Sequence, residues 1–427
     1  MKISGVFEDR DGILYVDGVS SLDLAEKYGT PLYVLSEKRV RENYRKLYRV
    51  LSKKSKNIRI YYAAKANTSL SVLKILKSEG AYLDTVSPGE VYLALKAGFA
   101  PEEILFTGTS VKNEELTFLL NLGIPINVDS FSQFKRILKI STPKFLSFRV
   151  NPQVEAGHHK HCITAGKDSK FGFWETEIVD VYREALKAGV EKFGIHMHIG
   201  SGILEVEPFV LAVEKLLNIA RRVHEETGIN FELINIGGGL GIPYKPDEKE
   251  LDLDLFSEKV FGLLDNGVKE YGLGKPALCI EPGRFIVGDA EILLTKVNTV
   301  KVTPHKKFVG VDAGFNMLLR PVLYGSYHHI VVANKLNHPP GETYDVVGPL
   351  CESGDFLAKD RKLPRIDEGD LLAVLNVGAY GYVMSSQYNS RPRCAEVLVM
   401  EGKHELIREA ETLESLLTGQ KIAEWLT

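Results

Sequence analysis

The sequence predicts a (β/α)8 barrel of the TIM type, which is an α/β fold, followed by an all-β domain. From about residue 58, apolar runs that suit strands alternate with amphipathic runs of helical period, and eight strands can be counted over about 230 residues. Eight such units favour a closed barrel, whereas a doubly wound parallel sheet, the alternative, normally needs fewer strands. After residue 286 strand-like runs follow one another with few helical stretches, which indicates a second domain built from strands.

The eight strands of the expected barrel are taken in chain order. The first, residues 58–66, reads IRIYYAAKA and precedes a helical pattern over 69–80 that ends in glycine. The other seven cover residues 82–87, 104–108, 125–130, 145–152, 192–200, 231–239 and 277–285. Amphipathic stretches separate them, and the longest, PFVLAVEKLLNIARRVHEETG, follows the sixth strand.

The second domain is expected to resemble a β-sandwich or a small barrel. Its strand-like runs cover residues 292–302, 307–313, 344–349, 370–378, 394–400 and 404–409. The N-terminal GVFEDRDGILYVDG resembles a hairpin because its Asp-Gly pairs suit tight turns, and we expect it to join this domain. The predicted barrel domain spans 30–285, and the predicted β domain takes in 1–29 and 286–427. A helical stretch is expected near the C-terminus, over 414–426.

Composition excludes several classes of protein. The chain has 427 residues, 44% of them hydrophobic, and a net charge of −3 from 53 basic and 56 acidic residues, so no broad field attracts nucleic acid or an anionic membrane. No apolar run suggests a membrane span or a signal peptide. The four cysteines, Cys162, Cys279, Cys351 and Cys394, are widely scattered, which is typical of reduced thiols in a cytoplasmic protein. We expect no metal site, and we interpret the histidine-rich HHKH at 158–161 as a solvated loop.

Chemically active side chains recur where the predicted barrel strands end, which is where barrels place their active sites. They are Lys65, Asp84, Ser87, Arg149, Asn151, His198, Ser201, Gly237–Gly239, Glu281 and Arg284. Lys65 has mostly apolar neighbours, and desolvation lowers the pKa of a lysine so that its neutral amine can bond to a carbonyl carbon. The glycine run could bring main-chain N–H groups close to a phosphate. Each feature also has a plain interpretation: a paired surface lysine, a core histidine and a tight turn.

Seven motifs, in order over nearly the whole chain, resemble those of diaminopimelate decarboxylases. They are YAAKAN (62–67), HMHIGSG (196–202), NIGGGLGIPY (235–244), EPGRF (281–285), DAGFNMLLRPVLYGSYHHI (312–330), CESGD (351–355) and GAYGYVMSSQYNSRPR (378–393). This family belongs to the fold-type III, alanine-racemase-like enzymes that use pyridoxal 5'-phosphate. The resemblance implies a barrel followed by a β domain. It also implies decarboxylation of meso-2,6-diaminopimelate to L-lysine and CO2, the last step of lysine biosynthesis, and a homodimer with active sites at the subunit interface.

The resemblance also implies roles for individual residues around the cofactor. Lys65 would bond to pyridoxal phosphate with support from Asp84, and His198 would stack on the pyridine ring. Ser201 and the glycines around Gly238 would hold the phosphate. Glu281 would face the ring nitrogen and keep it protonated, which favours decarboxylation over racemisation. Further expected cofactor contacts are Pro282, Gly283, Arg284 and Tyr380.

For the substrate, the resemblance implies that Arg284, Arg320 and Tyr324 clamp the distal end. Arginine suits this because its planar fork binds a carboxylate bidentately. Glu352 would pair with the distal ammonium, Tyr380 would contact cofactor and substrate, and Cys351 would donate the proton that replaces CO2. Cys351 and Glu352 would reach the active site of the neighbouring subunit.

Two departures from the family pattern and two alternatives bear on this interpretation. Gly202 stands where the family usually has glutamine, and the residue before Lys65 is not aromatic. One alternative is a related decarboxylase of ornithine, arginine or a carboxylated polyamine. The other is a regulatory protein that binds pyridoxal phosphate without turnover.

Overall fold

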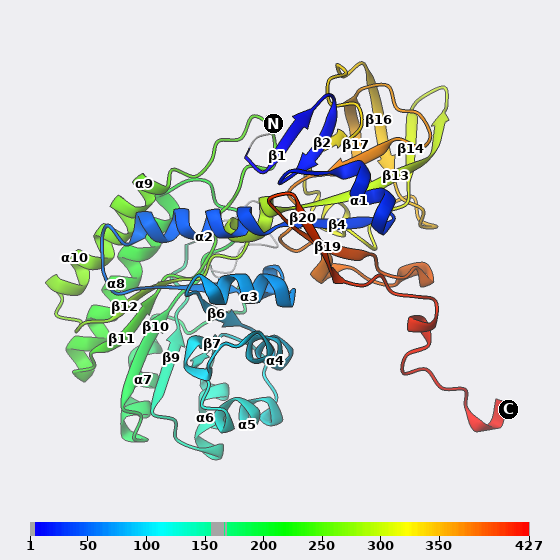
Figure 1. The fold of residues 1–427 in the computed structure, drawn as a ribbon. Coiled ribbons are helices and arrows are strands. Elements are labelled where there is room, and N and C mark those ends of the chain that lie inside the picture. The colour runs from blue at the N-terminus through cyan, green and yellow to red at the C-terminus, as the bar shows by residue number, and fades with distance from the viewer. Residues whose placement is uncertain (1–4, 155–165, 167–168, 427) are drawn as a thin grey trace. The chain divides into compact units, whose positions relative to one another are not determined.

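The computed structural model describes residues 5–154, 166 and 169–426, and the chain divides into two compact units (Figure 1). The barrel unit comprises Val40–Pro243 and Glu248–Val287. The β unit comprises Met1–Arg39, Tyr244–Asp247 and Gly288–Thr427. Residues 30–39, which we expected in the barrel, lie in the β unit because the strand within them pairs with strands of that unit.

The barrel unit contains the expected closed barrel of eight parallel strands, so the predicted fold class is confirmed. The strands are β5 (Ile58–Ala63), β6 (Tyr82–Thr85), β7 (Ile104–Phe106), β8 (Ile126–Val128), β9 (Phe145–Arg149), β10 (Lys192–His196), β11 (Phe231–Asn235) and β12 (Ala277–Ile280). Pairing of β12 with β5 closes the barrel, with Ile280 opposite Ile60. Because all neighbours are parallel, the carboxyl ends of all eight strands meet at one rim.

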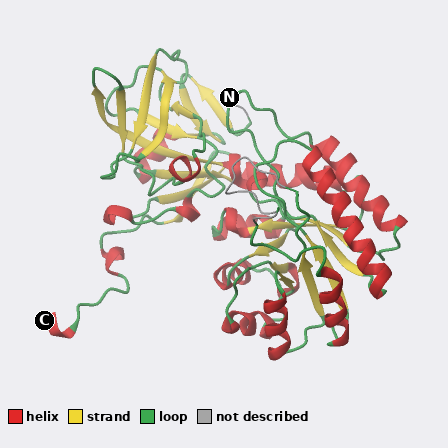
Figure 2. Cartoon of the chain, turned by 180° about the vertical axis from the view of Figure 1, so that it is seen from behind, coloured by secondary structure: helices red, strands yellow, loops and turns green. Residues whose placement is uncertain are grey.

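Helices surround the barrel strands (Figure 2). They are α2 (Glu37–Leu51), α3 (Leu70–Ser78), α4 (Pro88–Ala97), α5 (Asn113–Asn121), α6 (Phe131–Ile140), α7 (Ile178–Lys187), α8 (Glu207–Thr227), α9 (Leu253–Phe256), α10 (Gly262–Glu270) and α11 (Arg284–Val287). Local chemistry fixes where some of them begin. The Ser87 hydroxyl accepts from the N–H of Glu90 at the start of α4, and Pro88 occupies the first turn.

The β unit contains a nine-stranded sheet and a separate three-stranded one. The larger sheet is formed by β4 (Leu32–Ser36), β13 (Glu291–Val302), β14 (Lys307–Val311), β15 (Ile330–Val332), β16 (Glu342–Val347), β17 (Phe356–Leu363), β18 (Leu371–Val374), β19 (Ala395–Met400) and β20 (Lys403–Arg408). The smaller sheet joins β1 (Phe7–Arg10), β2 (Ile13–Val16) and β3 (Val19–Ser20). Phe7 pairs with Val16, which confirms the N-terminal hairpin. The two short helices of this unit are α1 (Ser21–Tyr28) and α12 (Arg320–Tyr324).

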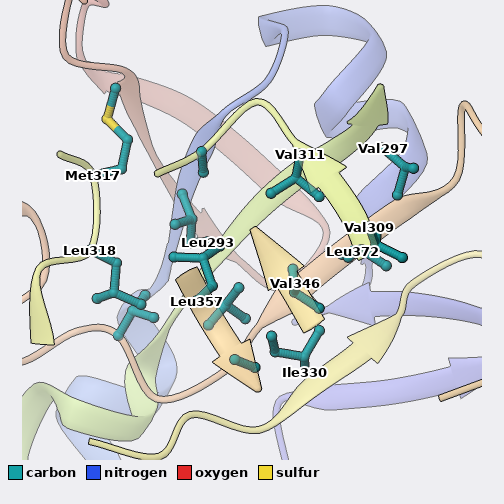
Figure 3. Close-up of a cluster of buried hydrophobic side chains, with 14 of the residues drawn as sticks. Leu293, Val297, Val309, Val311, Met317, Leu318, Ile330, Val346, Leu357 and Leu372 are labelled. Atoms are coloured by element: carbon teal, nitrogen blue, oxygen red, sulfur yellow. The ribbon is translucent and has the colours of Figure 1, made fainter. Parts of the chain in front are cut away.

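Branched aliphatic side chains fill the core of the β unit (Figure 3). Leu293, Val311, Val346 and Leu372 come from four different strands and are at most 2% exposed. A second cluster packs Leu14 and Val16 of the hairpin with Ile292. The hairpin is therefore part of the hydrophobic core of this unit.

The prediction of a helix over residues 414–426 is wrong. This segment forms only two single turns, Glu414–Leu417 and Glu424–Leu426, and Gly419 between them has φ of +80°. Its apolar side chains are exposed; Trp425 is 86% accessible. A short helix without a packed apolar face is marginal in water, so the local sequence pattern had no tertiary contact to stabilise it.

Two buried glutamates, Glu291 and Glu396, lie on the strands that flank β4 in the β unit. Both are 0% exposed, and Arg408 donates to Glu396 at 3.1 Å. Burial, together with the adjacent Glu396, raises the pKa of Glu291 well above its ordinary value. Burial also raises the pKa of Glu396, although Arg408 opposes this. We therefore infer that Glu291 is the member of the pair that carries a proton in the folded protein.

None of the helices in the described ranges has both the length and the apolar character needed to cross a membrane.

Candidate active site

Lys65 stands at the carboxyl end of β5, in the short turn Ala64–Ala66. Its Nζ donates to Oδ2 of Asp84 at 2.7 Å, and Asp84 is buried at the end of β6. The Thr107 hydroxyl donates to the other oxygen of the same carboxylate. Burial raises the pKa of Asp84 and Glu281 adds to this, whereas Lys65 opposes it. The first two strand ends thus deliver an amine and a carboxylate in direct contact.

Glu281, directly after β12, accepts hydrogen bonds from two side chains at the ends of neighbouring strands. His196 Nε2 lies 3.1 Å from both carboxylate oxygens, and Asn235 Nδ2 donates to one of them at 2.8 Å. Because a carboxylate only accepts, His196 carries its proton on Nε2. Burial alone would raise the pKa of Glu281, but His196 and Lys65 lower it to about 2. Glu281 is therefore ionised at neutral pH.

Sequence reasoning missed both partners of Glu281. His196 and Asn235 are 0% exposed and stand at paired positions of β10 and β11. A signal was present, because His196 opens the HMHIGSG motif and lies two residues before His198. Alternate residues of a strand point to the same side, so a second histidine at that spacing was a candidate for the barrel interior.

The glycine run after β11 permits a close approach of main chain that no side chain would tolerate. A Cβ on Gly237 would lie 2.3 Å from the Met197 carbonyl, and one on Gly238 would lie 2.1 Å from the Glu281 carbonyl. The Glu281 N–H donates to the Gly237 carbonyl at 2.8 Å, and the Gly237 N–H donates to Asn235 Oδ1 at 2.9 Å. The run is thus joined by its backbone to the residue that carries the buried carboxylate.

Arg284 and Ser201, both expected near the cofactor, are in contact. Arg284 Nη2 donates to the Ser201 hydroxyl at 3.1 Å, and Arg284 is 4% exposed. The turn before Arg284 packs on the first strand: the Pro282 carbonyl accepts from the N–H of Ala63 at 3.1 Å. A Cβ on Gly283 would lie 3.0 Å from Cβ of Ala66, so this position also requires a small residue.

His198 and Arg149 lie near these groups. The N–H of Gly200 donates to His198 Nδ1 at 3.2 Å, so that nitrogen is unprotonated. Burial and the charge of Arg149 hold the pKa of His198 well below its ordinary value, which makes the imidazole neutral. Arg149 lies over the Phe171 ring at 4.4 Å, and its Nη2 meets no hydrogen-bond partner among the described residues.

Two other strand-end residues have structural roles. Ser87 caps helix α4, and Asn151 bonds to both the carbonyl and the N–H of Gly166. The HHKH motif and Cys162 lie outside the described residues, and no group of metal-ligating side chains occurs in the part of the chain that is described.

The site residues predicted within the β unit lie at three places in that unit. Cys351 and Glu352 are exposed; the N–H of Cys351 donates to Asn389 Oδ1 at 3.0 Å, and Tyr388 donates to the Glu352 carboxylate. Arg320 and Tyr324 are the first and last residues of α12. Tyr380 has φ of +58°, an uncommon value for a tyrosine. Contacts of Arg320 with Tyr244 and His328 were not foreseen from the sequence.

The donor set of the barrel unit fits pyridoxal phosphate. A lysine amine suits its aldehyde, an ionised carboxylate suits its ring nitrogen, and a glycine turn beside an arginine and a serine suits its phosphate. The unsatisfied Nη2 of Arg149 adds a buried donor that an anionic oxygen could accept from.

Comparisons with known proteins agree with this chemistry. Residues 38–288 match the family model described as "Pyridoxal-dependent decarboxylase, pyridoxal binding domain". The chain is 58% identical to the diaminopimelate decarboxylase of Methanothermobacter thermautotrophicus over 96% of each chain, and 43% identical to that of Archaeoglobus fulgidus over 99% of this chain and 100% of the relative. Among solved structures, the M. jannaschii diaminopimelate decarboxylase in complex with L-lysine has a TM-score of 0.92 and 33% identity, with 100% of both chains covered.

Proposed function

The chain belongs to the diaminopimelate decarboxylase family of pyridoxal-dependent decarboxylases, and we propose that it converts meso-2,6-diaminopimelate to L-lysine and CO2. One observation carries the reaction type: Glu281 is buried, accepts from His196 and Asn235, and has a pKa lowered to about 2. When bound, pyridoxal phosphate supplies a ring that accepts the electrons left by the departing CO2. A carboxylate that stays ionised beside the ring nitrogen holds a proton there and so favours electron withdrawal.

The other residues of the barrel unit would bind and orient the cofactor. Lys65 would hold it through its amine while Asp84 keeps that amine in place. The neutral imidazole of His198 would pack against the ring. The phosphate would be bound by Ser201, Arg284 and the main chain at Gly238. Ser201 and Arg284 each offer a hydrogen-bond donor, and Gly238 lets the phosphate approach the main chain because it has no side chain. Pro282 and Gly283 would support this turn, and Tyr380 would complete the contacts from the β unit.

The distal half of the substrate carries a second amino acid centre. Its carboxylate needs a positively charged partner, and its ammonium needs a negatively charged one. Arg284, Arg320 and Tyr324 would bind its carboxylate, and Glu352 its ammonium. Cys351 would donate the proton of its Sγ to the carbon that loses CO2. The exposed positions of Cys351 and Glu352 support a homodimer in which they serve the neighbouring subunit's site. The cytoplasmic location expected from the cysteine pattern stays a prediction.

The test is release of CO2 and lysine from meso-diaminopimelate by the purified protein supplied with pyridoxal phosphate, with ornithine and arginine assayed in parallel. Lysine formed from diaminopimelate alone is the expected result. Turnover only of ornithine or arginine would overturn the substrate assignment and the roles of Arg320 and Glu352. Cofactor absorbance without turnover of any substrate would favour a regulatory protein.

A matched pair of lysine variants tests the role of Lys65. Lys65→Ala should abolish both activity and the absorbance of protein-bound cofactor. Lys54→Ala removes the same charge from an exposed position and should change neither. Retained turnover in the Lys65 variant would refute the proposal.

A further inference from the structure

Arg320, the first residue of α12, is a nearly buried cation with a defined set of partners within the β unit. It is 1% exposed. Its Nη1 lies 2.8 Å from the Tyr244 hydroxyl and 3.2 Å from His328 Nε2, and its Nη2 lies 3.3 Å from the Ser326 hydroxyl. The guanidinium carbon also lies 4.7 Å from the centroid of the Tyr244 ring.

The hydrogen bonds of His328 determine where its proton lies. An arginine can only donate, so His328 Nε2 accepts from Arg320. The carbonyl of Leu375 can only accept, so His328 Nδ1, 2.9 Å away, donates to it. His328 is therefore a neutral imidazole protonated on Nδ1. A proton on Nε2 would place an N–H against the N–H of the guanidinium.

The imidazole is held as firmly as the arginine. His328 is 0% exposed, and its ring packs edge-on against Tyr244 with centroids 5.3 Å apart and an interplanar angle of 79°. One end of the imidazole is thus tied to the main chain after β18, and the other end faces the guanidinium. Because this acceptor is fixed, it restricts rotation about the side-chain bonds of Arg320 and so limits the orientations of the guanidinium.

We propose that His328 is a positioning residue that orients the Arg320 guanidinium for the distal carboxylate of the substrate. This inference rests on the proposed function, in which Arg320 binds that carboxylate. His328 touches neither cofactor nor substrate in this scheme and acts only through the arginine.

Two substitutions separate positioning from a purely structural role. His328→Gln can place an amide oxygen near the position of Nε2, so it keeps an acceptor for Arg320 but loses the donor to Leu375. His328→Asn can keep a donor to Leu375 but cannot reach Arg320. If the role of His328 is purely structural, both variants should lose lysine affinity to the same extent, or His328→Gln should lose more. If His328 positions Arg320, the loss of lysine affinity should occur in His328→Asn.

The measurement is calorimetric binding of two ligands to the holoenzyme. L-Lysine carries a carboxylate at the end that decarboxylation leaves intact, and 1,5-diaminopentane is the same chain without it. We expect His328→Asn to weaken lysine binding about ten-fold, as for loss of one charge-assisted hydrogen bond, and to leave diaminopentane binding within about two-fold. His328→Gln should bind both ligands nearly as the unsubstituted protein does. In steady-state assays, the asparagine variant should raise KM for diaminopimelate more than it lowers kcat.

Arg320→Leu identifies which hypothesis fails. If it binds lysine as tightly as the unsubstituted protein, the carboxylate role of Arg320 in the proposed function is wrong. If it loses lysine affinity while His328→Asn retains it, only the inference about His328 is wrong. If His328 acts through Arg320, adding His328→Asn to the Arg320→Leu variant should cause no further loss of lysine affinity, and a further loss would overturn the inference.

Discussion

The buried carboxyl pair in the β unit predicts an unusual dependence of folding stability on pH. Neither oxygen of Glu291 has a hydrogen-bond partner among the described residues, and the adjacent Glu396 adds to the effect of burial on its pKa. Glu291 has a pKa well above the ordinary value of 4.5, so the folded protein keeps a proton that the unfolded chain releases. Folding then takes up a proton, and stability falls as pH rises from about 4.5 towards the folded pKa.

One proton taken up on folding corresponds to a slope of about 1.4 kcal/mol per pH unit. Between pH 5.5 and 7.5 this amounts to about 2.7 kcal/mol if the folded pKa lies above that window. Glu291→Gln replaces the protonated carboxyl with a neutral amide of nearly the same size. We expect the variant to match the unsubstituted protein near pH 5.5 and to be more stable by up to about 2.7 kcal/mol at pH 7.5.

The assay is urea unfolding followed by far-UV circular dichroism at four pH values from 5 to 8, on both proteins with the same cofactor loading. Glu342→Gln is the control of opposite sign. Lys307 and Tyr344 lower the pKa of Glu342, so its ionised form stabilises the fold above its unfolded pKa, and this contribution is lost as pH falls. That variant should be less stable than the unsubstituted protein by a nearly constant amount from pH 5 to 8, because the lowered pKa of Glu342 lies below this range. Parallel pH profiles for Glu291→Gln and the unsubstituted protein would refute the raised pKa of Glu291.

The remaining predictions concern the barrel site and Cys351, the proposed proton donor. Gly238→Ala forces a Cβ to within 2.1 Å of the Glu281 carbonyl; we expect about 1–3 kcal/mol of destabilisation in thermal unfolding and loss of bound cofactor absorbance, and a variant that retains the cofactor would contradict the turn assignment. Asn235→Ala removes a donor to Glu281 and should lower kcat about ten-fold with the cofactor retained, whereas an unchanged kcat would show that His196 suffices. Cys351→Ser should keep cofactor absorbance and substrate affinity but lower kcat by at least ten-fold, and an unaltered rate would assign the proton to another group. Removing pyridoxal phosphate by dialysis should lower Tm reversibly, because a ligand of the folded state stabilises it.

The barrel was predictable because its strands are buried and parallel, and such strands are continuous apolar runs that local sequence shows directly. Residues 32–36, which form β4, were placed in the predicted barrel domain and not recognised as a strand of the β domain. The partners of β4 are β13 and β19, more than 250 residues away in the chain, and no local pattern indicates that pairing. The C-terminal segment shows the reverse error, in which a helical pattern lacked the packing that helices of this length require.

The residues of the candidate site also divide into those that local sequence indicates and those whose contacts depend on distant parts of the chain. Lys65, Asp84 and Glu281 could be proposed from the sequence because each stands at a predicted strand end, and Lys65 and Glu281 also lie within motifs. The contact of His196 with Glu281 depends on the register between strands that are far apart in sequence, and so does the bond from Asn235. His328 was part of a motif, but its role became visible only once the carbonyl of Leu375 fixed its proton.

Because the glycine run and Glu281 are joined through their backbones, the barrel site is expected to accept only a cofactor of a particular length. The Glu281 main chain bonds to Gly237, its carbonyl lies against Gly238, and its side chain is tied to Asn235. The proposed anchors for the two ends of the cofactor therefore belong to one stiff frame and not to separate loops. An analogue of pyridoxal phosphate whose phosphate arm is one methylene longer would be too long to fit between both anchors, so this frame selects a cofactor by its dimensions as well as by its charge.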